Sequence, residues 1–85
     1  MIIQTTGPFD RDYAGLPDLI KEQADKQLSF FLGNPHHPSL RIKKIKGHEK
    51  IWEGRVTKNY RFTLQIEGET YILRRIGTHN ILKTP

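Results

Sequence analysis

The stretch Ile51-Trp-Glu-Gly-Arg-Val-Thr-Lys-Asn-Tyr-Arg-Phe-Thr-Leu-Gln-Ile66 predicts two β-strands joined by a tight turn. Polar and apolar residues alternate in its second half, and successive side chains of a strand point to opposite faces. The apolar face of that half consists of Tyr60, Phe62, Leu64 and Ile66, and its polar face of Arg61, Thr63 and Gln65. In the first half, Trp52 and Val56 share one face and Arg55 points the opposite way. The hairpin is therefore expected to bury an apolar face and to present Arg55 and Arg61 on the other.

Length and composition predict one small domain that spans residues 1–85. The hydrophobic content of 35% is low, so we expect a thin core with helices on only one face of a sheet. The chain contains no cysteine, which rules out disulfides and cysteine-based zinc sites. We find neither a long apolar run nor a signal-peptide pattern, and we expect a cytoplasmic protein without a membrane partner.

The charge is distributed unevenly along the chain. Residues 1–39 hold three Lys or Arg and five Asp or Glu, a net charge of −2. Residues 40–85 hold eleven Lys or Arg and four Asp or Glu, a net charge of +7. A basic half of this kind suits a polyanion such as RNA or DNA, or an acidic protein. Its alternative role is to keep the protein soluble.

The elements before the hairpin are predicted to be a strand and two helices. Residues 1–5 form the strand, which Gly7-Pro8 ends. A short helix is marked by apolar residues at helical spacing, namely Phe9, Tyr13 and Leu16. Pro17 opens a longer helix, whose apolar stripe consists of Leu19, Ile20, Ala24, Leu28, Phe31 and Leu32. Gly33-Asn34-Pro35 is expected to end it with a left-handed cap at Gly33, so that the two helices form an antiparallel hairpin.

Four strands are expected to complete the sheet. Residues 40–46 are predicted to form a strand with a bulge or at an edge, because their alternation slips midway. The hairpin turn is placed at residues 57–60, with Asn59 in a left-handed conformation. The last strand is predicted at residues 70–76, and residues 81–85 form a short tail. The fold class is therefore α+β, with an N-terminal strand and a helical hairpin on one face of a mostly antiparallel four- to five-stranded sheet.

Several short motifs together resemble the RelE/ParE superfamily of type II toxin–antitoxin toxins. They are Phe9-Asp-Arg-Asp-Tyr13 with Leu16-Pro17, Asn34-Pro35-His-His-Pro38-Ser-Leu40, Lys43-Lys-Ile-Lys-Gly47, Trp52-Glu-Gly-Arg-Val56, Tyr60-Arg61 and Leu73-Arg-Arg-Ile-Gly-Thr-His79. Each motif is weak alone, but together they cover nearly the whole chain in the right order. The Gly77-Thr-His79 ending looks most like the RelE-like toxins of the YafQ type. The family fold is a helical hairpin packed on one face of a mostly antiparallel sheet.

The resemblance implies a ribosome-dependent endoribonuclease, or mRNA interferase. Such a toxin enters the ribosomal A site and cleaves the exposed mRNA codon, and a cognate antitoxin silences it by wrapping its surface. The expected partners are therefore an antitoxin protein and the ribosome, with its rRNA and its A-site mRNA. Neither a cofactor nor a metal is expected.

RNA cleavage without a metal needs a base for the 2′-hydroxyl, cations for the phosphorane and a proton donor for the 5′-oxygen. The resemblance places Arg61 where many of these toxins carry a catalytic arginine, and Arg55 where they carry a catalytic His or Arg. A guanidinium matches phosphate oxygens and stays charged, so we expect both arginines to contact the scissile phosphate. The alternative is an ion pair of Arg61 with Glu53 or Glu67, and a surface charge at Arg55.

His79 is the candidate general acid or base, because imidazole titrates near neutral pH. It matches the histidine after Gly-Thr in the family ending, and its alternative role is to cap a loop. His48 is a possible accessory residue whose alternative is a solvated loop position. His36 and His37 are adjacent and cannot easily face one ligand, so we expect no metal site there.

The expected RNA-binding residues are basic side chains of the C-terminal half, namely Lys43, Lys44, Lys46, Lys50, Arg75 and Lys83. Such residues follow phosphates without reading the sequence. The alternative for the lysines at residues 43–50 is an edge strand that their charge protects from other strands. Arg74 and Arg75 are consecutive and are expected on opposite faces of their strand, so that only one joins the arginines of the hairpin.

The C-terminal tail departs from the family pattern. Related toxins usually carry a Tyr or Phe near the C-terminus that acts on the substrate nucleotide, whereas Leu82 or Lys83 falls there in this chain. Lys83 can lend a charge to a phosphate, but it cannot stack like a ring. The alternative function is therefore a non-catalytic toxin of the same fold, either a DNA gyrase inhibitor or a degenerate member that retains only antitoxin binding.

Overall fold

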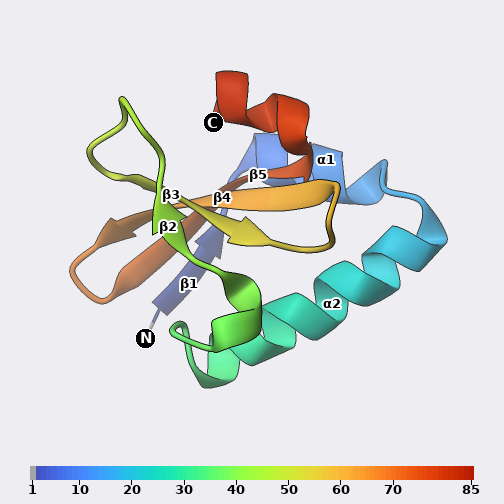
Figure 1. The fold of residues 1–85 in the computed structure, drawn as a ribbon, viewed down its shortest axis with the longest axis horizontal. Helices are drawn as coiled ribbons and strands as arrows, with labels where there is room; N and C mark the ends of the chain where they lie inside the picture. The colour runs from blue at the N-terminus through green and yellow to red at the C-terminus, as the bar shows by residue number, and fades with distance from the viewer. Residues whose placement is uncertain (1) are drawn as a thin grey trace.

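The computed structural model describes residues 2–85 as two helices packed on a five-stranded sheet (Figure 1). The strands are β1 (Ile2–Thr5), β2 (Lys43–Lys44), β3 (Ile51–Arg55), β4 (Tyr60–Glu67) and β5 (Thr70–Thr78). Their order in the sheet is β1-β5-β4-β3-β2, with β1 parallel to β5 and the other pairs antiparallel. The expected α+β class is confirmed. Met1, which was expected in the first strand, lies outside the described residues.

Both predicted helices are present, α1 (Gly7–Ala14) and α2 (Asp18–Gly33). The Thr6 hydroxyl oxygen caps α1 by accepting a hydrogen bond of 3.2 Å from its first turn. α2 begins directly after Pro17, whose fixed backbone angle suits a helix start. The left-handed cap expected at Gly33 is wrong, because α2 continues through Gly33 and ends at the extended Asn34 (φ −159°). Neither helix of the described chain is both long and apolar enough to cross a membrane.

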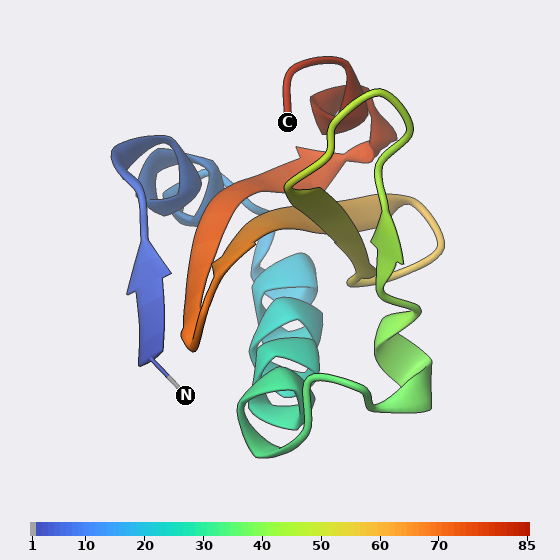
Figure 2. The same cartoon turned by 90° about the vertical axis from the view of Figure 1, so that its left-hand side faces the viewer.

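The core lies between the helices and the apolar face of the hairpin, and Figure 2 shows α2 beneath the curved sheet. Phe62 and Leu64 of β4 are fully buried. Phe31 of α2 meets the Phe62 ring edge to face, with the ring centroids 5.9 Å apart. The other buried members of the cluster are Phe9, Leu16, Ala24, Leu40, Val56, Leu73 and Ile76. The apolar face expected from the alternation is therefore confirmed.

The helices form the expected antiparallel hairpin. Tyr13, near the end of α1, donates a hydrogen bond of 2.6 Å to Asp25, in the middle of α2. This bond raises the pKa of the Tyr13 hydroxyl above its usual value. Phe9, one turn earlier in α1, lines a cavity of about 400 Å³ with Leu28 and Phe31 from later in α2. The contacts thus advance in opposite directions along the two helices.

A glycine in β3 makes room for the largest buried ring of the sheet. Gly54 is the cross-strand partner of Phe62. A Cβ atom on Gly54 would overlap the Phe62 ring, and it would lie 2.9 Å from Cδ1 of Ile42. The absence of a side chain at this position therefore allows the ring to lie directly over the strand.

Two strand boundaries differ from those expected. β2 contains only Lys43–Lys44 rather than residues 40–46, because a 3₁₀ helix, η1 (Pro38–Leu40), and the left-handed Arg41 (φ 46°) precede it. The edge position expected for this strand is confirmed. β5 continues to Thr78, so Gly77 lies within the strand rather than ending it.

The hairpin turn closes without the left-handed Asn59 that was expected. Instead, the Thr57 hydroxyl oxygen accepts hydrogen bonds of 3.2 Å from the backbone N–H groups of both Asn59 and Tyr60. The side chain of Thr57 thus satisfies the backbone donors of the turn, and no positive φ is needed.

The sheet face opposite the helices is partly covered, because a 3₁₀ helix, η2 (His79–Lys83), folds back over it (Figure 2). Ile81 lies over Gly77, with its Cγ2 3.0 Å from where a Cβ would stand. Thr63 Oγ1 donates a hydrogen bond of 3.3 Å to the main-chain oxygen of Pro85. The short tail expected at residues 81–85 is thus packed on the sheet and begins within η2, for which the missing side chain of Gly77 leaves a place.

Gln27 of α2 links this helix to the C-terminal end of β3, and its side chain is buried. Its Nε2 donates hydrogen bonds to the carbonyl oxygens of Ser39 and Arg55, at 3.2 and 2.8 Å. Gln27→Ala removes both hydrogen bonds, and we expect it to lower the free energy of unfolding by about 1–3 kcal/mol. Urea denaturation measures this, with Gln23→Ala, at an exposed position of the same helix, as the control. Equal losses in the two variants would contradict the role of Gln27.

Candidate functional site

Arg55 and Arg61 lie directly opposite each other on β3 and β4, as the alternation of the hairpin predicts. On the next strand, Gly77 is the partner of Arg61. Directly paired residues of neighbouring strands share a face, so both arginines lie on the side of the sheet away from α2. We call this side, which carries Arg55 and Arg61, the arginine face.

The Arg61 side chain is held by the turn that precedes it. Its Nη1 donates hydrogen bonds to the carbonyl oxygens of Thr57, Lys58 and Tyr60, the last two at 3.0 Å. Its Nε lies 3.7 Å from a carboxylate oxygen of Glu53, so the ion pair considered as the alternative for Arg61 is present. Within residues 2–85, Nη2 makes no hydrogen bond. The guanidinium is therefore fixed in position with one nitrogen left for a ligand.

Glu53 is a residue of the arginine face that the sequence motifs did not single out as functional. It is only 8% exposed, and its cross-strand partners are Lys43 on β2 and Thr63 on β4. A signal was available, because Glu53 and Arg55 are two residues apart in one strand and therefore share a face. The burial of Glu53 was not predictable in this way, since it depends on the elements packed around β3.

His79 is the first residue of η2, immediately after β5. The residue before it, Thr78, pairs with Tyr60, so His79 follows β5 at the end of the sheet where Arg61 lies. Its side chain is exposed and makes no hydrogen bond within the described residues. Lys83, at the other end of η2, is also exposed. Both side chains are therefore accessible to a ligand.

Arg75, one of the expected RNA-binding residues, is paired with α1. Its Nε donates a hydrogen bond of 2.6 Å to Oδ2 of Asp12, and this bond raises the pKa of the guanidinium above its usual value. The same carboxylate oxygen accepts a hydrogen bond of 3.2 Å from the Ile76 N–H. Asp12 thus joins α1 to β5, and Arg75 takes part in holding the fold together.

The expectation that Arg74 and Arg75 lie on opposite faces is wrong. A β-bulge shifts the register of β4 and β5 next to Thr63, and Arg74 is the extra residue without a partner. Arg74 Nε donates a hydrogen bond of 3.1 Å to Pro85, and Arg75 Nη1 donates one of 3.2 Å to Thr84, in both cases to the main-chain oxygen. Because of the bulge, both arginines reach the same C-terminal segment.

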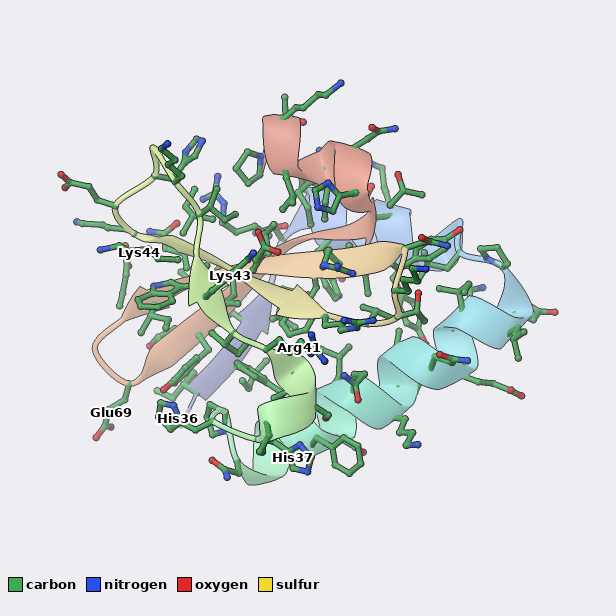
Figure 3. The ribbon with its side chains drawn as sticks, viewed as in Figure 1. His36, His37, Arg41, Lys43, Lys44 and Glu69 are labelled. Carbon is green, nitrogen blue, oxygen red and sulfur yellow. The ribbon has the colours of Figure 1, made fainter. Side chains whose placement is uncertain are left out.

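The lysines expected to contact RNA do not form a single row. Lys43 is the partner of Glu53 on the arginine face, whereas Lys44 is the partner of Trp52 and points to the other face (Figure 3). The Nζ of Lys44 is 5.7 Å from the centre of the Trp52 ring. The loop between β2 and β3 carries the other two, Lys46 and Lys50. All four are exposed, so they surround the β2 edge with positive charge rather than lining one groove.

The remaining histidines lie on loops. The His37 ring stacks on Phe30, with centroids 4.3 Å apart, and its Nδ1 accepts a hydrogen bond of 3.2 Å from a backbone N–H two residues later. His36 lines a cavity of about 230 Å³ with Arg41. His48 is exposed in the loop between β2 and β3. Within residues 2–85, no three His, Asp or Glu side chains are grouped in a way that could hold a metal ion.

Arg55, Arg61 and Glu53 share the arginine face, and His79 follows β5 at the end of the sheet where Arg61 lies. Two guanidinium groups can bind phosphate oxygens, as arginine does in bidentate pairs. The carboxylate of Glu53 and the imidazole of His79 can accept or donate protons. η2 contains no Phe, Tyr or Trp, and its sequence is His79-Asn-Ile-Leu-Lys83. The set therefore suits acid–base chemistry on a phosphate but offers no Phe, Tyr or Trp ring on this helix for stacking on a base.

No protein-family model matches the chain, and no curated protein matches it. Solved structures do match it over nearly its whole length. A chain of the RelB-RelE antitoxin-toxin complex from Methanococcus jannaschii has a TM-score of 0.77 and 23% identity, covering 95% of both chains. The YoeB/ParE toxin from Agrobacterium tumefaciens has a TM-score of 0.77 and 19% identity, covering 93% of this chain and 99% of that toxin. YafQ from E. coli strain BL21(DE3) has a TM-score of 0.77 and 14% identity, covering 94% of both.

Because these identities are low, the comparison shows the fold of the chain alone. The order of strands and helices and the helical hairpin on one face of the sheet are those that the sequence motifs implied. The protein has the fold of the RelE, YoeB/ParE and YafQ toxins.

Proposed function

We propose that this chain is the toxin of a type II toxin–antitoxin pair and that it cleaves mRNA on the ribosome without a metal or a cofactor. The observation that carries the proposal is the register of the hairpin, which sets Arg55 directly opposite Arg61. His79 follows β5 at the same end of the sheet. The fold shared with the RelE and YafQ toxins supports the same function.

In this reaction the arginines bind the scissile phosphate. Arg61 is already oriented by the carbonyl groups of its turn, so little reorganisation is needed when charge develops on the phosphorane. Arg55 lies across from it and adds a second positive charge. His79 donates a proton to the 5′-oxygen that leaves, a role for which imidazole is suited near neutral pH.

The partners follow from the charge of the surface. The exposed lysines at residues 43–50 and Lys83 would contact rRNA and mRNA phosphates. Among the matched structures, RelE is found in a complex with the antitoxin RelB, and YafQ in a complex with DinJ. We propose by analogy that a cognate antitoxin binds this chain and silences it, and that the toxin acts in the cytoplasm.

The test is to express the chain in growing bacteria and to map the ends of translated mRNA by primer extension. Cuts in phase with codons are expected, and naked RNA should be cleaved poorly, because the few groups of the site cannot hold a flexible substrate in line by themselves. The control is the double variant Arg61→Ala/His79→Ala. Equal toxicity and equal cleavage by this variant would refute the assignment of the site.

A second candidate is a non-catalytic toxin, either a DNA gyrase inhibitor or a member that retains only antitoxin binding. The observation that favours it is the absence of a Tyr or Phe in η2. The same cells distinguish the two functions. Intact mRNA together with gyrase-linked DNA breaks would contradict mRNA cleavage and support inhibition of gyrase.

A further inference from the structure

Glu53 has an environment that a purely structural carboxylate rarely has. The residue is 8% exposed, yet within residues 2–85 its side chain accepts no hydrogen bond. Its nearest cation is Nε of Arg61 at 3.7 Å, which is too long for a hydrogen bond. Buried polar groups are almost always hydrogen-bonded, because desolvation without a partner is costly. The described part of the protein therefore supplies no hydrogen-bond donor to the carboxylate of Glu53.

The missing donor can come from outside. No side-chain oxygen in the described chain is both fully enclosed and without a hydrogen bond, so the unbonded oxygens of Glu53 keep some contact with the surface. The side chain is on the arginine face, where its cross-strand partners are Lys43 and Thr63. The cations beside Glu53 on this face are Lys43, Arg55 and Arg61. An anion that binds to these cations would therefore be placed beside the carboxylate of Glu53.

In RNA, the group next to the scissile phosphate is a proton donor. The 2′-hydroxyl is on the ribose carbon adjacent to the one that carries the phosphate, so a base for this hydroxyl must lie within a few ångströms of the phosphate clamp. Glu53 and Arg61 satisfy this requirement, because their charged groups are 3.7 Å apart. The distance suits two groups that act on adjacent atoms of one nucleotide.

We infer that Glu53 is the general base of the cleavage reaction, an inference that rests on the proposed function. Its carboxylate accepts the proton of the 2′-hydroxyl while the 2′-oxygen forms a bond to phosphorus. The bond from phosphorus to the 5′-oxygen breaks, and His79 gives its proton to that oxygen. The products are a 2′,3′-cyclic phosphate and a 5′-hydroxyl end. Glu53 then loses its proton to water and His79 takes up a proton from water, which restores both groups.

The competing role for Glu53 is to position Arg61 through their ion pair. The two roles differ in what a small carboxylate from solution can replace. In a Glu53→Ala variant, formate can enter the vacated space and accept a proton, whereas chloride can balance the charge of Arg61 but is not a useful base. Restoration of cleavage by formate and not by chloride therefore reports proton transfer rather than positioning.

The experiment measures single-turnover cleavage of mRNA on programmed ribosomes by the purified full chain. Glu53→Gln and Glu53→Ala are each expected to lower the rate about 10²- to 10⁴-fold, and formate should raise the Glu53→Ala rate in proportion to its concentration. Each Glu53 variant should bind ribosomes whose A-site codon is 2′-O-methylated with an affinity within threefold of the wild-type chain. Glu22→Gln, at an exposed position of α2, is the control and should cleave at the wild-type rate. Circular dichroism verifies that each variant is folded.

The possible outcomes separate the two proposals. If the wild-type chain cleaves and Glu53→Gln cleaves within about threefold of it, Glu53 is not the base, and the proposed function stands. If both variants are slow but formate and chloride act alike, Glu53 positions Arg61 and the inference is also overturned. If the wild-type chain cleaves no mRNA on ribosomes, the proposed function itself fails and the inference falls with it.

Discussion

Replacing Arg61 by lysine is expected to lower ribosome-dependent mRNA cleavage by about 10²- to 10³-fold, the loss typical of removing one donor that stabilises a transition state. Lysine keeps the positive charge, but it has no fork to bind two phosphate oxygens. It also cannot bond to three carbonyl groups of the turn while it presents a further nitrogen to a ligand, as Arg61 does. Single-turnover cleavage of mRNA on programmed ribosomes measures the effect.

The matched control for this substitution is Arg11→Lys. Arg11 is exposed on α1 and is not part of the arginine face, so the same chemical change there should leave the cleavage rate unchanged. The melting temperature of the Arg61→Lys variant must also be measured, because Arg61 supports the turn. A folded Arg61→Lys variant that cleaves at the wild-type rate would show that the fork of Arg61 has no part in the reaction.

Gly54→Ala is expected to be the most destabilising single substitution that we propose, with a loss of about 3 kcal/mol, the upper part of the range for overpacked cores. The new Cβ would overlap the Phe62 ring, which is fully buried, and would approach Ile42 Cδ1. The ring cannot move away freely, because Phe31 packs against it edge to face. Urea denaturation monitored by circular dichroism measures the loss, which is large for a domain of this size.

Gly33→Ala provides the control for Gly54→Ala. The backbone at Gly33 has helical geometry at the end of α2, and nothing lies within 4 Å of the position of a new Cβ. Alanine favours a helix over glycine by about 1 kcal/mol in a helix interior and by less at an end, so a small gain in stability is expected. If the two variants unfold at the same urea concentration, the close contact of Phe62 with β3 is not a constraint on the fold.

The alternation of the hairpin was sufficient to predict the position of the two central arginines. Period-two alternation fixes which side chains share a face, and Arg55 and Arg61 were therefore expected together before the register was known. The core could be predicted for the same reason, since Phe62 and Leu64 have the opposite parity to Arg61. These predictions depend on local geometry alone, which is why the structure confirms them.

The features that the sequence did not predict depend on contacts between distant segments. The bulge at Arg74 has no distinctive residue to mark it, and it shows itself only in the pairing of β4 with β5. The return of η2 over the sheet requires the empty space above Gly77, which the sequence does not reveal as a contact for Ile81. The burial of Glu53 without a hydrogen bond likewise arises from the elements packed around β3 rather than from any motif.

The parallel pairing of β1 with β5 has a consequence for the time at which the sheet can be completed during synthesis. Thr6 is bonded to the backbone oxygen of Arg74, 68 residues later, and β1 has no other strand beside it. A contact this distant cannot form until β5 has left the ribosomal exit tunnel, and such non-local contacts also slow folding. β1 therefore has no partner strand in the nascent chain, and the sheet stays incomplete, until β5 is outside the tunnel.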